Sequence, residues 1–113
     1  MLRRLDKLTA SIASPPLTEN ERERAEVLRQ KGNQLISQNA FEAAELSYRE
    51  ALNFTPNDSK ILICLGFALK EQNRLSDARV ALFRALSKES NSQIAFEARY
   101  LLGEISEIQL DHA

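Results

Sequence analysis

Cysteine, glycine and histidine are all scarce in this chain of 113 residues, and each shortage excludes a class of function. The one cysteine, Cys64, cannot form a disulfide within the chain, which favours an intracellular protein or one indifferent to redox state. It lies in an apolar run with no base nearby, which predicts a packing residue rather than a catalytic thiol. Three glycines are too few for a glycine-rich phosphate loop. Cys64 and the one histidine, His112, cannot supply the four ligands of a typical structural zinc site.

Long apolar runs and an excess of one charge are also missing. No run approaches the roughly 18 to 20 residues that span a bilayer, and the first residues lack the apolar core of a secretory signal. Fifteen Lys and Arg against sixteen Asp and Glu leave a net charge of −1, so no overall field would attract nucleic acid or an anionic membrane. We therefore expect a cytoplasmic protein that binds neither nucleic acid nor membrane, needs no metal or cofactor, and is not an enzyme.

What the sequence does contain is an internal repeat, with a period of about 34 residues. Shifting the chain by this period aligns small residues with small ones and large apolar residues with large apolar ones. The aligned pairs are Gly32 with Gly66, Ala44 with Ala78, Ala51 with Ala85, Leu28 with Leu62, Leu35 with Leu69, Tyr48 with Leu82 and Asn39 with Asn73. Because these positions recur at helical spacing on both sides of a polar break, each unit predicts a helical hairpin.

Local signals predict where the helices of the first hairpin begin and end. Asn39 is expected to cap the start of the second helix, with Glu42 three residues later completing a capping box. Pro56 is expected to close the unit, because proline cannot continue a helix interior. We expect Gly32 and Ala44 to face each other where the two helices approach, since small side chains let the backbones come close.

These positions resemble the tetratricopeptide repeat family. Residues 25–58 and 59–92 supply its pattern, namely Leu28, Gly32, Leu35, Ala44, Tyr48, Ala51 and Pro56 in the first unit, and Leu62, Leu65, Gly66, Leu69, Ala78, Leu82 and Ala85 in the second. Lys31 and Ser90 depart from it, and neither unit begins with tryptophan. A partial third unit or capping helix follows at 93–110. The resemblance implies an all-α fold, with hairpins stacked in a right-handed superhelix over residues 18–113.

The expected helices of the repeat domain lie near 19–37, 41–53, 58–71, 75–88 and 93–109, with Thr18 and Glu21 forming a capping box for the first. Residues 1–17 are expected to form a separate amphipathic helix and a proline-containing linker. Its apolar face consists of Leu2, Leu5, Leu8 and Ile12. We expect this helix to pack on the start of the stack or on a second copy. The alternatives are a place in the binding groove and an unstructured tail.

The geometry of the family implies that the first helix of each unit lines a concave binding face. The residues expected to line a peptide-binding groove there are Arg29, Asn33, Lys60, Ile63, Phe67, Lys70, Tyr100 and Leu101. An apolar centre with charged edges favours an amphipathic helix or an extended apolar peptide as the ligand. Arg29 and Asn33 resemble part of a carboxylate clamp found in the family. We reject the clamp because Cys64, Glu97 and Leu101 stand where it needs polar or basic residues.

Three functions are compatible with this sequence. The first is an adaptor or scaffold that binds a peptide or helix of a protein partner in the groove. The second is a self-assembling scaffold, or the N-terminal fragment of a longer repeat protein, and the third is a chaperone-like protein that shields an apolar partner. Homodimerisation is expected because the last helix carries an apolar stripe where the first unit has polar residues. The stripe consists of Leu102, Ile105, Ile108 and Leu110.

Overall fold

The computed structural model describes residues 18–88 and 91–111, and its elements are five α-helices. The helices are α2 (Glu19–Ser37), α3 (Phe41–Phe54), α4 (Ser59–Glu71), α5 (Leu75–Lys88) and α6 (Ser92–Asp111). Within these ranges there is no strand, and each helix expected in the repeat region is present with its ends close to the predicted ones. The helix predicted over residues 2–13 lies outside the described part of the chain.

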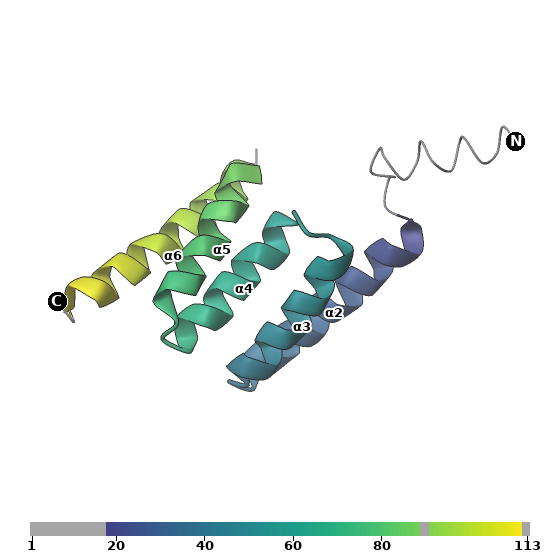
Figure 1. Cartoon of the computed structure of the whole chain (residues 1–113), viewed down its shortest axis with the longest axis horizontal. Helices are drawn as coiled ribbons and strands as arrows, with labels where there is room; N and C mark the ends of the chain where they lie inside the picture. The colour runs from purple at the N-terminus through teal and green to yellow at the C-terminus, as the bar shows by residue number, and fades with distance from the viewer. Residues whose placement is uncertain (1–17, 89–90, 112–113) are drawn as a thin grey trace, which may run out of the picture.

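The helices form two hairpins followed by a single helix, and they lie side by side in chain order (Figure 1). Helix α2 packs on α3, and α4 packs on α5. Contacts between α3 and α4 join the two hairpins, and α6 packs on both α5 and α4. Because the turn within each hairpin is very short, its two helices are forced to run back along each other.

Two asparagines at equivalent positions of the sequence repeat end the first helix of each hairpin. Asn39 (φ 59°) and Asn73 (φ 60°) adopt the left-handed conformation, which asparagine tolerates better than most residues. The N–H of Asn39 donates to the carbonyl of Ile36 at 2.9 Å, and the N–H of Ala40 donates to the carbonyl of Leu35 at 2.9 Å. The corresponding two bonds close α4. The predicted N-cap at Asn39 and its capping box are therefore wrong, because Asn39 belongs to a Schellman motif that ends α2.

Each hairpin closes tightly over a glycine of its first helix. A Cβ atom on Gly66 would lie 2.7 Å from Cγ and Cδ2 of Leu82, and a Cβ atom on Gly32 would overlap the ring of Tyr48. Both large side chains are fully buried. Ala44, which we expected opposite Gly32, is also buried, but the side chain that covers Gly32 is that of Tyr48. The same close approach thus recurs at the equivalent glycine of each unit.

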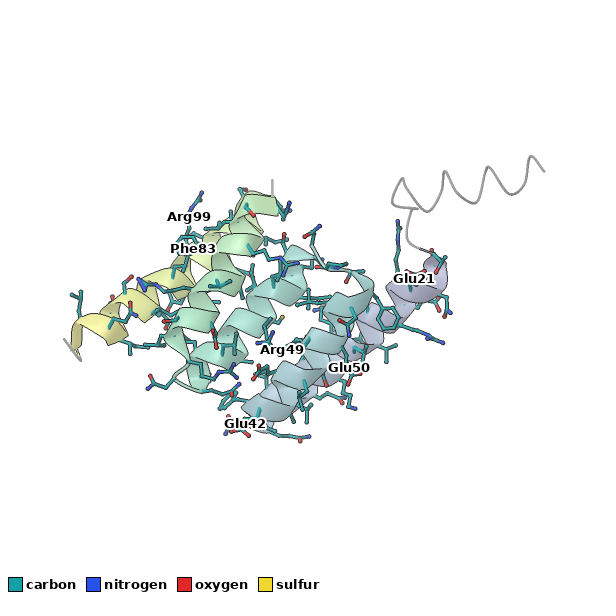
Figure 2. The ribbon with its side chains drawn as sticks, in the orientation of Figure 1. Glu21, Glu42, Arg49, Glu50, Phe83 and Arg99 are labelled. Carbon is teal, nitrogen blue, oxygen red and sulfur yellow. The ribbon has the colours of Figure 1, made fainter. Side chains whose placement is uncertain are left out.

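A buried carboxylate links the two hairpins. Glu45 on α3 accepts hydrogen bonds from Arg49 Nε at 2.8 Å, from the Arg74 guanidinium at 2.7 Å and from Gln72 Nε2 at 3.1 Å. Arg49 belongs to the same helix (Figure 2), whereas Gln72 and Arg74 come from the turn between α4 and α5. Burial by itself would raise the pKa of Glu45. The hydrogen bonds from Arg49 and Gln72, together with both guanidinium charges, outweigh burial and lower the pKa.

The last helix turns part of its apolar stripe inward. Ile105 is fully buried together with Ala98, two turns before it, in the contact of α6 with the preceding hairpin. Leu102 and Ile108 are half-buried, and Leu110 is exposed. We expected a second copy to cover this stripe, but Ile105 is covered by the preceding hairpin of its own chain.

Candidate functional site

A hollow of about 430 Å³ opens on the face made by α2, α4 and α6. Its walls come from these three helices, and α3 contributes Tyr48. The lining residues are Asn33, Ile36, Tyr48, Ile63, Cys64, Phe67, Phe96, Glu97, Tyr100 and Leu101. Apolar and aromatic side chains dominate this set. We call the hollow the groove.

The structure brings most of the predicted site residues together here. Asn33, Ile63, Phe67, Tyr100 and Leu101 line the groove, as the repeat register predicts. That they bind a ligand stays a prediction.

The three basic residues of the predicted site lie beside the groove. Arg29 and Lys60 line a second hollow that shares Ile63, Cys64 and Glu97 with the groove. Lys70 lines neither hollow and lies above the ring of a groove residue, Phe67. The predicted basic residues therefore border the groove and do not enter it.

The groove has a buried floor and an exposed aromatic edge. Ile63 is only 7% exposed and Leu101 is buried, so both belong to the floor. Phe96 and Tyr100, one helical turn apart on α6, are 67% and 60% exposed. Phe96 was not among the predicted site residues, although its spacing of four from Tyr100 places both on one face of a helix.

Two interactions hold Phe67 in position. Its ring meets the edge of Phe41, with the ring centroids 6.4 Å apart and an interplanar angle of 70°. The Nζ atom of Lys70 lies 5.3 Å from the centroid of the same ring, within the range of a cation–π interaction. Ile63 is buried and belongs to the core as well as to the groove, so its polar replacement should lower the stability of the chain.

Two of the basic side chains beside the groove form ion pairs. Lys70 binds Glu104 of α6 at 3.1 Å and Glu71 at 3.3 Å. Burial would lower the pKa of Lys70, but its hydrogen bonds to these two carboxylates outweigh burial and raise it. Arg29 binds Glu26 at 2.6 Å, and this hydrogen bond lowers the pKa of the Glu26 carboxyl. Both basic side chains are therefore already paired with carboxylates of the chain before a ligand binds.

The Tyr48 hydroxyl and the Cys64 thiol, both in the lining of the groove, are held in their protonated forms. The Tyr48 hydroxyl donates to Asn33 Oδ1 at 2.5 Å, and burial raises the pKa of this hydroxyl well above its usual range. Burial also raises the pKa of the Cys64 thiol. A thiol held in its protonated form is a poor nucleophile, which agrees with a packing role for Cys64.

Neither a membrane span nor a cluster of metal ligands accompanies the groove in the described residues. Over residues 18–88 and 91–111, no helix is long and apolar enough to cross a membrane. In the same residues, no three His, Cys, Asp or Glu side chains are grouped so that they could hold a metal ion. No family model matches the chain, and no curated protein matches it either. We therefore infer the function from the groove itself.

Proposed function

We propose that this protein is a non-catalytic adaptor of the tetratricopeptide repeat type, which binds a peptide or an amphipathic helix of a partner protein in the groove. The exposure of Phe96 and Tyr100 at the edge of an apolar hollow is the observation that carries the proposal. Large aromatic side chains beside a preformed pocket are the residues that most often dominate the energy of an interface. A peptide in the groove would remove both rings from water.

Equivalent geometry at equivalent positions supports the assignment to the repeat family. Asn39 and Asn73 share one backbone conformation, and Gly32 and Gly66 share one type of contact, each pair separated by the same interval as the sequence repeat. A repeat of the backbone at the period of the sequence is what stacked helical units require.

The chemistry of the groove indicates the kind of peptide. An apolar floor favours a peptide with leucine, isoleucine or aromatic side chains spaced along one face of a helix. The wall formed by α6 carries Glu97 inside the groove, whereas the nearby Glu104 is paired with Lys70. Basic residues beside the apolar face of the ligand would therefore add attraction and speed association.

Selection from a displayed library of amphipathic helical peptides tests this proposal. We expect the native chain to enrich peptides with an apolar face and basic flanks, and Phe96→Ser with Tyr100→Ser to lose them. The matched control is Val80→Ser with Phe83→Ser, because these residues of α5 are 66% and 58% exposed but do not line the groove. Enriched peptides that bind the groove variant as well as the native chain would refute the proposal.

Self-assembly is a second candidate, supported by the outer surface of α6. A Cβ atom added to Gly103 would meet nothing within 4 Å, and Leu110 near the end of the same helix is exposed. A second copy could pack on this surface, because a repeat helix with one open side stacks readily on another. Light scattering across a concentration series, with Leu110→Asp for comparison, would detect such a dimer and its loss. A mass that stays monomeric at high concentration excludes it.

A further inference from the structure

Residues 1–17 and helix α6 carry opposite charge. Residues 1–17 hold three basic residues and one acidic residue, a net charge of +2. Helix α6 holds one basic residue and four acidic residues, a net charge of −3. The acidic residues of α6 are Glu97, Glu104, Glu107 and Asp111. These two parts of the chain therefore attract each other within a single molecule.

The apolar pattern of the same segment matches the groove. Leu2, Leu5, Leu8 and Ile12 recur at intervals of three and four residues, so they fall on one face if residues 2–13 are helical. The exposed rings of Phe96 and Tyr100 and the apolar floor beneath them are a surface that such a face would cover. The segment therefore has the chemistry that we propose for a groove ligand.

The linker is long enough to bring the segment to the groove. Thr18 directly precedes α2, and groove residue Asn33 lies 15 positions further along the chain, which is ~22 Å at 1.5 Å per residue. A helix over 2–13 would extend ~18 Å. The linker over 14–17 would add up to ~14 Å of extended chain. A helix that turns back along α2 can therefore place its first leucines beside Asn33.

We infer that residues 2–13 of the chain occupy its own groove, bound as an amphipathic helix. This inference rests on the proposed function and adds regulation to it: a partner peptide binds only when it displaces the segment. Tethering gives the segment a millimolar effective concentration, which favours its own chain over a second copy. The apparent affinity for the partner falls by the fraction of molecules whose groove is filled.

The start of the stack is a less suitable place for the segment. A hollow exists there between α2 and α3, beside Val27 and Phe54. Leu28 adds to its apolar surface, but Asn20, Glu23, Arg24 and Glu50 complete the lining, so charged groups of both signs border the place where the leucines would lie. Burying these groups against an apolar face would cost free energy.

Thiol reactivity of the full chain tests the inference, because the one cysteine, Cys64, lines the groove. A segment bound about nine-tenths of the time slows the reaction of Cys64 with a thiol reagent about tenfold. Leu5→Asp should remove this protection, whereas Ala10→Asp makes the same charge change away from the apolar face and should preserve it. Equal rates in the three chains would overturn the inference. So would protection of the native thiol that fades on dilution, because that result assigns the groove to a second copy.

Hydrogen exchange tests the same contact through the backbone amides of residues 2–13. Tyr100→Asp should speed exchange of the amides in residues 2–13, and Phe83→Asp on α5 should leave it unchanged. If Tyr100→Asp leaves the exchange rate of residues 2–13 unchanged, the segment does not bind in the groove and the inference is overturned. The proposed function can stand without this inference, since groove-dependent peptide selection by the native chain does not need the segment to bind. It falls separately if neither the native chain nor Leu5→Asp enriches any peptide.

Discussion

Alanine at Gly66 and alanine at Gly103 should change the stability of this protein in opposite directions. Both glycines lie within helices, so alanine at either position gains about 1 kcal/mol of helix propensity. At Gly66 the new Cβ atom would lie 2.7 Å from two carbons of Leu82, far inside the roughly 3.5–4.0 Å at which carbon atoms attract each other. Leu82 is fully buried, so moving its side chain aside would cost free energy. Overpacking of this kind costs about 1–3 kcal/mol, and more when several atoms clash.

We therefore expect Gly66→Ala to destabilise the protein by up to about 2 kcal/mol after the gain in propensity is subtracted. Gly103→Ala meets no atom within 4 Å and should stabilise it by up to about 1 kcal/mol. Gly66→Leu adds three more carbons to the same space and should cost several kcal/mol. Urea unfolding followed by far-ultraviolet circular dichroism measures all three differences. Equal stabilisation by both alanines would refute the close approach of α4 and α5 and the repeat register that predicts it.

Three further outcomes can be checked by the same unfolding measurement. Glu45→Gln should cost about 1 kcal/mol at neutral pH, since hydrogen bonds to a charged group are stronger than those to a neutral one. Because folding lowers the pKa of Glu45, this difference should be complete above about pH 5.5 and vanish as the pH falls through and below the ordinary value of 4.5. Ile63→Ser should destabilise by about 2–4 kcal/mol, whereas Tyr100→Ser should stay within about 0.5 kcal/mol. Asn39→Gly should be neutral or slightly stabilising, but Asn39→Ala should cost about 1 kcal/mol, because only glycine accepts a positive φ without strain. A larger loss for glycine than for alanine would contradict the left-handed turn.

The helices could be predicted from the sequence because the spacing of the apolar residues and the positions of the polar breaks indicate the same helices. Large and small residues recur at helical spacing over every element from α2 to α6, and a polar break stands between them. Asn39 shows where this evidence is ambiguous. Asparagine is favoured both as the first cap of a helix and as the left-handed residue after one. In so short a turn these places are adjacent, so sequence alone does not decide between them.

The groove was predictable as a set of positions but not as a set of environments. The repeat register assigns Ile63 and Tyr100 to the same face, yet one is buried and the other is mostly exposed. That difference depends on how far each helix is covered by its neighbours, which periodicity does not encode. Ile105 is the same case, since only the packing of α6 on the preceding hairpin shows that this side chain is internal.

The ammonium group of Lys70 connects two walls of the groove. This one group lies above Phe67 of α4 and pairs with Glu104 of α6. Only 9% of the Lys70 side chain is exposed, and mobile ions screen such a partly buried pair much less than a pair on the open surface. Added salt should therefore leave this connection largely intact. A wholly uncharged peptide should then bind with an affinity that hardly changes with ionic strength, so a salt-sensitive affinity would report charges on the ligand itself.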